Sequence, residues 1–324
     1  MSLKGPRLIG VITNLNSRQN RQGKYNRTRL LNIVGRAGLV RETREFEELP
    51  EVVEAFRKKG VDVIAINGGD GTYGTVITEL INQYGGDERP PVFLLRGGTI
   101  NVLASAIGVS RGDPASLLAR FTRDLYERKR LWSSSTIGSV KVTNPELSAP
   151  SYGFVFANGL VYNFVKSYYN YGDPNWIRAL RVTLRDILLA PLPISWLNET
   201  WSPLEAETVI DGERWPYRDV MVSTAAAIEK LALWFKPFTK KPDHRSGFAF
   251  LLNSMSRTEI YRKWWKLSRA RFSHERHFNR LAQKVVFKTS AGYLLDGDLW
   301  RPSGEINLTV ENGPPIEVLT PGGE

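Results

Sequence analysis

Short apolar runs alternate with amphipathic stretches over roughly the first 130 residues of the chain. The apolar runs have the length of strands, and the stretches between them repeat their apolar residues at helical spacing. The apolar runs cover residues 8–12, 61–66 and 92–95, and the helical patterns cover 28–36, 49–59, 72–84, 101–107 and 114–128. Strands that alternate with helices favour a parallel sheet. We therefore expect an α/β domain over residues 1–132.

The pattern changes after Trp132 to short β-type runs with few helical stretches between them. These runs cover residues 137–142, 152–157, 220–223, 248–252, 285–288 and 306–310. Two helical insertions are expected, one over 174–189 and one over 257–284. Antiparallel β-structure is the prediction for this part of the chain, residues 133–311.

Length and composition are consistent with two folded domains. The 324 residues exceed the usual size of one hydrophobic core. The chain has no cysteine, which excludes a disulfide framework and thiolate metal sites and fits a reducing compartment. The longest weakly charged stretch, 188–198, is interrupted by two prolines and is too short to span a bilayer. No secretion signal is evident, so we expect a cytoplasmic protein.

The charge balance predicts an anionic partner. Lys and Arg number 44 against 33 Asp and Glu, which gives a net charge of +11. Such an excess concentrates anions at the surface. Nucleic acid, an acidic membrane and nucleotide phosphate all fit this charge, so the motifs must distinguish them.

A glycine-rich turn at residues 68–72 follows the second apolar run. Glycines allow the backbone to approach phosphate oxygens, and backbone N–H groups are unpaired where a strand meets a helix. Asp70 supplies a carboxylate of the kind that Mg²⁺ prefers, and Thr72 can cap the next helix. The segment therefore suits a nucleoside triphosphate. A plain Asp-Gly turn between two elements is the alternative.

Two further segments carry candidate chemistry. Residues 96–101 repeat the order of strand, glycine turn and helix start, with Thr99 and Asn101 facing the same expected groove or, alternatively, capping the helix. Near the C-terminus, Asp296 and Asp298 flank a glycine between two β-type runs. This segment is either a hairpin turn or a general base assisted by a second carboxylate.

The three segments together resemble the catalytic domain shared by diacylglycerol kinases, sphingosine kinases and their bacterial lipid-kinase relatives. The family pattern GGDGT matches residues 68–72, the PxGTxN-type motif matches 98–101, and DGE matches Asp296-Gly297-Asp298. Two weaker similarities accompany these motifs. Asn14-Leu15-Asn16-Ser17, followed by Arg18, is similar to the family's first phosphate-contacting turn, and Thr43 is similar to a nucleotide-contacting threonine.

The resemblance implies a phosphofructokinase-like α/β domain followed by an antiparallel β-sandwich, with ATP in the cleft between them. Residues 312–324 are a segment that can return to the first domain. ATP and Mg²⁺ are the implied cofactors, with Asp70 at the ATP–Mg²⁺ site and Asp296 with Asp298 forming the base that receives the lipid hydroxyl proton. The implied nucleotide-binding residues are Asn14, Asn16, Ser17, Arg18, Thr43, Gly68, Gly69, Asp70, Gly71, Thr72, Gly98, Thr99 and Asn101.

The chain departs from the family pattern at Arg18, Thr75, Val102, Ser246 and Asp298. Ser246 stands where relatives hold a structural Mg²⁺ with Asp, so no second metal is assigned. Two alternatives to an ATP-dependent lipid kinase therefore stay open. One is a kinase for a small molecule, similar to NAD kinases, and the other is a nucleotide-binding protein of the same fold without catalysis.

Two basic segments bear on the lipid substrate. Residues 175–190 form a helical pattern with Arg178, Arg181 and Arg185 on one face, and residues 261–272 interleave aromatic and cationic side chains. Such segments are typical of peripheral contact with an anionic membrane, here the inner membrane surface, although simple packing with a solvated face is the alternative. No nucleic-acid-binding module accompanies them, so nucleic acid is not the expected partner. An oligomer is left open.

Overall fold

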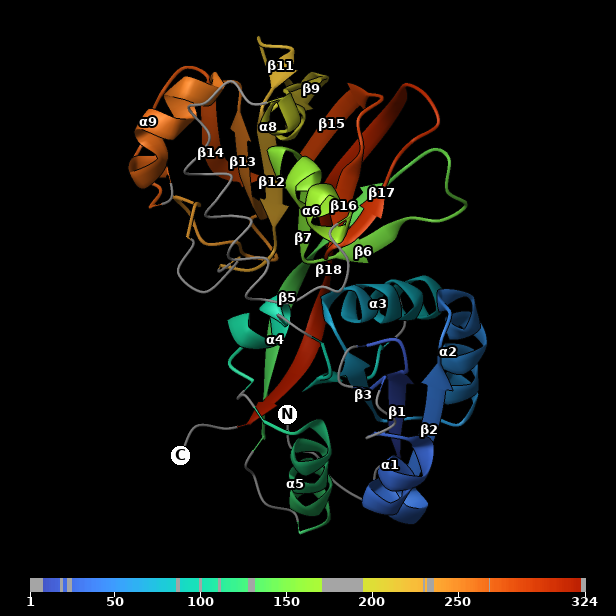
Figure 1. Cartoon of the computed structure of the whole chain (residues 1–324). Coiled ribbons are helices and arrows are strands. Elements are labelled where there is room, and N and C mark those ends of the chain that lie inside the picture. Colours follow the sequence, from blue (N-terminus) through green and yellow to red (C-terminus); the bar gives the residue numbers. More distant parts are fainter. Residues whose placement is uncertain are drawn as a thin grey trace. The chain divides into compact units, whose positions relative to one another are not determined.

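The computed structural model describes residues 8–17, 20–21, 25–85, 88–98, 101–109, 112–127, 132–170, 195–229, 231, 236–267 and 269–321. Two predicted nucleotide contacts, Arg18 and Thr99, and the predicted basic helix at 175–190 lie outside these residues. The chain forms two compact units, unit 1 with residues 1–137 and 315–324 and unit 2 with residues 138–314. Figure 1 shows their elements.

Unit 1 contains a parallel sheet with the strand order β18-β4-β3-β1-β2. Its strands are β1 (Ile9–Asn14), β2 (Gly38–Thr43), β3 (Val63–Gly68), β4 (Val92–Arg96) and the end of β18 (Ile306–Pro321). Every residue of β1, β3 and β4 is buried. Parallel strands covered on both faces are apolar throughout, which is why the sequence indicated these three. β2 has two buried positions, Val40 and Thr43, each preceded by two half-buried ones, and it did not stand out.

Helices connect the strands of unit 1. They are α1 (Arg27–Val34), α2 (Leu49–Lys58), α3 (Asp70–Tyr84), α4 (Val102–Ala106) and α5 (Pro114–Tyr126), with short 3₁₀ turns η1 (Gly35–Ala37) and η2 (Phe46–Glu48). The start of α5 follows from its sequence, because Asp113 accepts a hydrogen bond from the Ser116 amide and Pro114 occupies the first turn. Phe121 of α5 stacks on Phe93 of β4, with ring centroids 4.4 Å apart. The predicted α/β architecture is confirmed.

Unit 2 is built mainly from antiparallel strands. One sheet has the order β14-β13-β12-β7-β16-β17. Its strands are β7 (Val155–Gly159), β12 (Val222–Ala226), β13 (Phe248–Asn253), β14 (His277–Ala282), β16 (Tyr293–Leu295) and β17 (Asp298–Trp300). A second group runs β10-β9-β15-β18, and β5 pairs with both β18 and β6. Its strands are β5 (Trp132–Thr143), β6 (Ser151–Gly153), β9 (Glu207–Ile210), β10 (Glu213–Arg214) and β15 (Lys284–Thr289).

The two groups of strands share one hydrophobic core. Phe156 of β7, Phe250 of β13 and Phe287 of β15 are fully buried in it. Phe156 and Phe287 stack across the core with ring centroids 5.9 Å apart. Side chains from two sheets that meet in this way form the core of a β-sandwich, so the predicted antiparallel domain is confirmed.

The smaller elements of unit 2 are a two-stranded ladder, β8 (Leu204–Glu205) with β11 (Asp219–Val220), and the helices α6 (Leu160–Asn170), α8 (Ser195–Thr200) and α9 (Arg257–Leu267). The predicted helical insertion over 257–284 is wrong beyond Leu267. Residues 277–282 instead form β14, which pairs with the whole of β13. Pairing with β13 and packing of Phe278 against the core outweigh the local pattern there.

Candidate functional site

The two glycine turns of unit 1 touch each other. Strands β3 and β4 are neighbours, and Gly68 at the end of β3 is paired with Arg96 at the end of β4. A Cβ atom placed on Gly98 would lie 2.4 Å from the Cα of Gly69. The two backbones are thus too close for a side chain, which explains glycine at both turns.

The second of these turns precedes α4, and the first leads directly into α3. This 15-residue helix begins at Asp70, and its cap residue, Gly69, makes no side-chain hydrogen bond to it. The first amides of a helix combine unpaired donors with the positive end of the helix dipole. A phosphate group is the ligand that such a turn suits best.

The loop after β1 is tied to the first glycine turn. Asn14 donates from Nδ2 to Thr72 Oγ1 at 3.0 Å and accepts at Oδ1 from the Asn16 amide at 2.8 Å. Asn20, which is buried, donates to the Asn14 carbonyl at 2.7 Å and accepts from Asn67 Nδ2 at 3.1 Å. Sequence reasoning missed Asn20 and Asn67. The signal that could have found Asn67 was an amide side chain directly before two glycines in an apolar strand.

Asp70 connects the two turns through its carboxylate. The amide of Val102 donates to Oδ2 at 2.9 Å and the amide of Leu103 donates to Oδ1 at 3.0 Å. Asp70 therefore caps α4 from another part of the chain. Burial raises the pKa of Asp70, and the amide hydrogen bonds and the nearby Arg96 guanidinium oppose that rise.

Asn101 braces the second turn. It has a left-handed backbone, with φ of 53°, and its side chain makes no capping hydrogen bond to α4. Instead Nδ2 donates to the Gly98 carbonyl at 2.9 Å, and Oδ1 accepts from the Gly98 amide at 3.2 Å and from the Tyr73 hydroxyl at 3.3 Å. The side-chain amide of Asn101 makes its hydrogen bonds within the turn, so this residue acts on the shape of the turn.

The remaining described contacts of the predicted nucleotide site lie at the same edge of the sheet. Thr43 is the last residue of β2, and its carbonyl accepts from the Leu15 amide at 2.9 Å. Asn16 is exposed in the loop after β1 and donates from Nδ2 to the Arg44 carbonyl at 2.8 Å. Ser17 follows in that loop, and its carbonyl accepts from the Asn20 amide at 2.8 Å. The carboxyl ends of neighbouring parallel strands are where open α/β sheets bind ligands.

A cavity of about 610 Å³ lies at the opposite edge of the unit 1 sheet. Asp62 and Pro91, which precede β3 and β4, line it together with Tyr84 at the end of α3. None of the predicted nucleotide contacts borders this cavity. It is therefore separate from the edge that carries the glycine turns.

In unit 2, Asp296 and Gly297 form the turn between β16 and β17. Both have positive φ, 51° and 98°, as a two-residue type I′ hairpin requires. The Asp296 carboxylate accepts from the amides of Phe154 at 3.0 Å and Val155 at 2.9 Å. The side chain thereby fixes the start of β7 against the hairpin, which is a structural task.

Asp298 differs from Asp296 in its surroundings. It is the first residue of β17 and is half-buried. Burial raises the pKa of Asp298 to about 6. Its carboxylate accepts no hydrogen bond from the described part of the chain. A carboxylate with a raised pKa and unused acceptor capacity is suited to take a proton near neutral pH.

The described residues contain no cluster of three or more His, Asp or Glu side chains arranged to hold a metal ion. No second metal is assigned at Ser246, whose Oγ donates to Asp243 Oδ2 at 3.0 Å. That carboxylate also accepts from the Arg245 amide at 3.3 Å. These hydrogen bonds lower the pKa of Asp243 and close the local turn. Among the described helices, none has the length and apolar character needed to cross a membrane.

The parallel sheet and its paired glycine turns define an α/β unit whose turns have the form that suits a phosphate group. Residues 9–131 match the family model described as the diacylglycerol kinase catalytic domain. Over these residues the chain is similar to that family.

Comparison with curated relatives supports the same family. Residues of this chain are 41% identical over 81 positions to the probable lipid kinase YegS of Shigella flexneri, and the same figures hold for YegS of Escherichia coli O1:K1. The matches cover 25% of this chain and 27% of each relative, so the chain spans about a quarter of the length of these proteins.

Solved structures resemble the whole chain more broadly. A putative diacylglycerol kinase from Bacillus anthracis superposes with a TM-score of 0.67 at 16% identity, covering 97% of this chain and 98% of the other. Yeast NADH kinase, complexed with NADH, superposes with a TM-score of 0.51 at 12% identity, covering 98% and 84%. At these identities the likeness establishes the fold, which is that of diacylglycerol kinases.

Proposed function

We propose that the chain is an ATP- and Mg²⁺-dependent kinase that transfers the γ-phosphate to a hydroxyl group of a diacylglycerol-like or sphingoid-like lipid. The observation that carries this proposal is the contact between the glycine turns of β3 and β4, within the segment that matches the family. In this proposal unit 1 binds ATP and unit 2 binds the lipid.

The residues of unit 1 fit ATP. The backbone of Gly68, Gly69 and Gly98 presents no side chain to a phosphate, and α3 offers its first amides. Asn14 holds Thr72 in place, so both polar side chains stand beside the first turn. We propose that the phosphates bind at these turns, with Asn16, Ser17, Arg18, Thr43, Gly71, Thr99 and Asn101 completing or shaping the site.

Asp70 is the proposed carboxylate for Mg²⁺. Its oxygens accept amide hydrogen bonds from Val102 and Leu103, and these two bonds do not use all of the roughly four lone-pair positions of a carboxylate. Mg²⁺ usually binds through one or two carboxylates together with substrate phosphates, so one protein carboxylate is sufficient. When bound, the ion would neutralise charge on the phosphate oxygens.

Asp298 is the proposed general base. The attacking lipid hydroxyl forms a bond to the γ-phosphorus while the bond to ADP breaks, and the hydroxyl proton passes to the Asp298 carboxylate. Phosphoryl transfer depends mainly on positioning, so no covalent intermediate with the chain is required. Asp296 then acts indirectly, by holding the hairpin that carries Asp298.

A second candidate is a nucleotide-binding protein without kinase activity. It is favoured by one observation, namely that the carboxylates of both Asp70 and Asp296 already accept hydrogen bonds from backbone amides.

We also propose that the protein works in the cytoplasm at the inner membrane surface, where a lipid substrate and anionic headgroups are found.

The test is transfer of labelled phosphate from ATP to lipids in vesicles, with NAD as a soluble acceptor in parallel. We expect labelled lipid with the natural chain and at least a 100-fold loss with Asp298→Asn, because a positioned base contributes about 10²–10⁴-fold. Label on NAD and on no lipid would overturn the lipid assignment. ATP binding without transfer to any acceptor would favour the second candidate.

A further inference from the structure

Helix α9 is amphipathic, and its inner face is packed into unit 2. Ile260, Trp264 and Leu267 follow one another at helical spacing. These three side chains belong to a hydrophobic cluster whose other members are Trp201, Met221, Met255, Leu160 and Phe272. The helix is therefore fixed to the body of the unit by one face, and its rotation about its own axis is set.

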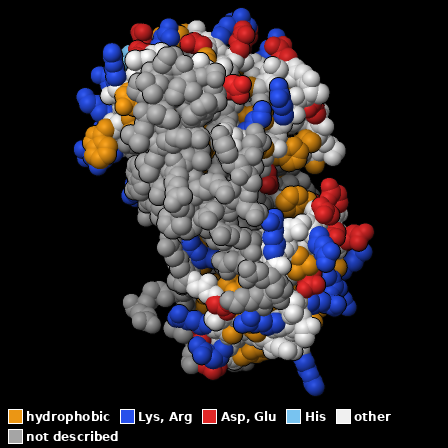
Figure 2. All heavy atoms as spheres, viewed as in Figure 1, with side chains coloured by type: hydrophobic (Ala, Val, Ile, Leu, Met, Phe, Trp, Pro, Cys, Tyr) orange, Lys and Arg blue, Asp and Glu red, His pale blue; other side chains and the backbone are white. Residues whose placement is uncertain are grey.

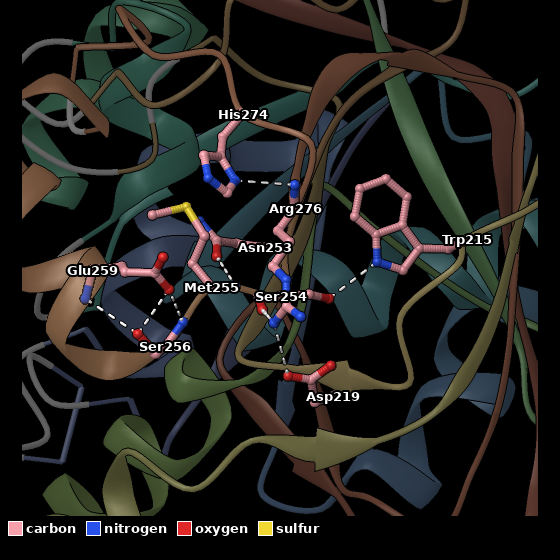
Figure 3. A network of polar contacts seen from close by, with 9 residues as sticks. All are labelled: Trp215, Asp219, Asn253, Ser254, Met255, Ser256, Glu259, His274 and Arg276. Atoms are coloured by element: carbon pink, nitrogen blue, oxygen red, sulfur yellow. Dashed lines mark hydrogen bonds and ion pairs between the residues drawn. The ribbon is translucent and has the colours of Figure 1, made fainter.

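The start of α9 is also fixed. The Ser256 amide donates to Glu259 Oε2 at 2.9 Å, and the Ser256 hydroxyl donates to the same oxygen at 2.7 Å (Figure 3). This pair resembles a capping box, in which the residue at the helix start and the third residue after it satisfy each other. Glu259 is the acid in the first turn of α9, and these bonds direct it to the helix start, away from the outer face.

The residues that precede α9 are hydrogen-bonded to other parts of unit 2. Ser254 Oγ accepts from Trp215 Nε1 at 3.0 Å, and its carbonyl accepts from an Arg276 guanidinium nitrogen at 3.3 Å (Figure 3). Arg276 also lies 3.6 Å from the Asp219 carboxylate. The segment that leads into α9 is thus connected to two other parts of unit 2.

The outer face of α9 exposes two large aromatic side chains among cations. Tyr261 and Trp265, one helical turn apart, are 38% and 63% exposed. Arg262 and Lys266, each next in sequence to one of them, are also exposed, and the Arg269 guanidinium lies 3.6 Å from the centre of the Trp265 ring. Figure 2 shows hydrophobic atoms bordered by Lys and Arg over this helix. We call Tyr261, Arg262, Trp265, Lys266 and Arg269 the α9 face.

We infer that the α9 face docks the protein onto an anionic lipid bilayer. Trp and Tyr favour the boundary between water and hydrocarbon, and Lys and Arg favour anionic headgroups, so one helix presents both attractions to the same plane. The acid that could oppose them is held at the helix start. The charge of the face is complementary to a negatively charged membrane. This inference deepens the proposed function, because the proposed lipid substrate is held in a bilayer.

The experiment measures co-sedimentation of the full chain with vesicles of phosphatidylcholine, with and without phosphatidylglycerol. Each basic residue near an anionic surface strengthens binding about fivefold, so Arg262→Gln/Lys266→Gln should weaken binding to the anionic vesicles about thirtyfold. The matched control is Arg36→Gln/Lys59→Gln, which removes the same charge from exposed positions of unit 1. We expect the control to bind within about twofold of the natural chain.

A second pair of variants tests the aromatic contribution. Trp265→Ala should weaken vesicle binding at least about fivefold, whereas Phe46→Ala, which removes a 46% exposed aromatic side chain from unit 1, should not. Tryptophan fluorescence should shift to the blue on addition of anionic vesicles, and the shift should shrink in Trp265→Phe. Circular dichroism and thermal unfolding verify that each variant is folded.

Some outcomes would overturn the docking surface. Equal binding of the charge variant and its control, or preferential binding of a single-stranded oligonucleotide over the vesicles through the same residues, would each refute it. The kinase proposal is judged separately, by phosphate transfer to a short-chain lipid in solution. Variants of the α9 face that lose vesicle binding but still phosphorylate the short-chain lipid would support both proposals. Vesicle binding that depends on α9, without phosphate transfer to any acceptor, would support the docking surface and refute the kinase proposal.

Discussion

The contact between the glycine turns predicts that Gly98→Ala is costly. The added Cβ would lie 2.4 Å from the backbone of Gly69, whereas ordinary contacts begin at 3.4 Å, so the turns must separate by about 1 Å. Neither partner is a flexible side chain that can move aside. Overpacking of this kind costs about 1–3 kcal/mol of unfolding free energy.

Urea unfolding of Gly98→Ala beside Gly112→Ala measures this cost. A Cβ at Gly112 meets nothing within 4 Å, and its backbone is ordinary, so we expect that variant to stay within about 0.5 kcal/mol of the natural chain. If the chain is a kinase, a displacement of about 1 Å at the phosphate site should also lower kcat/KM about 100-fold. Equal stability of the two variants would refute the contact between the turns.

Four further predictions concern carboxylates. Asp298→Asn should raise the unfolding free energy at pH 7 but not at pH 4. The pKa of Asp298 is about 6 in the folded chain and 3.8 ordinarily, so stability from this carboxyl group is lost as the pH rises from 3.8 to 6. Unfolding measured at both pH values tests this difference. In the natural chain kcat/KM should fall below about pH 6, as the base becomes protonated, and a profile flat to pH 5 would exclude Asp298 as the base. Asp70→Ala should lower the unfolding free energy by about 1–3 kcal/mol, because two α4 amides lose their hydrogen-bond acceptor. Unchanged stability in urea unfolding would contradict this prediction. Gly153→Ala should destabilise the chain by about 1–3 kcal/mol in the same assay, because its Cβ would lie 2.6 Å from an Asp296 carboxylate oxygen. The control is Gly304→Ala, whose Cβ would have no atom within 4 Å and which should leave the stability unchanged.

Much of the fold could be predicted from the sequence, because burial on both faces leaves a continuous apolar run. Strands β1, β3 and β4 are of this kind. β2 escaped notice because its buried positions are separated by half-buried ones. The strand at 277–282 was mistaken for helix, since its pairing with β13 is a contact between distant residues that no local pattern records.

The candidate site was predictable in its glycines and less so in its polar contacts. A glycine turn after an apolar strand predicts backbone approach to a phosphate, and that assignment stays a prediction. The bonds from Asp70 to the amides of Val102 and Leu103 join residues more than 30 positions apart, so they could not be foreseen. The amide hydrogen bonds to Asp296 likewise come from Phe154 and Val155, which are distant in sequence.

The capping of α4 by Asp70 has a consequence for how this region folds. The helix has five residues, too few to be stable alone, and its own cap residue makes no side-chain bond to it. Its first amides are satisfied only after β3 and β4 are paired and Asp70 is in place. The stability of α4 is therefore coupled to the sheet edge, and a variant that displaces Asp70 should loosen this helix as well.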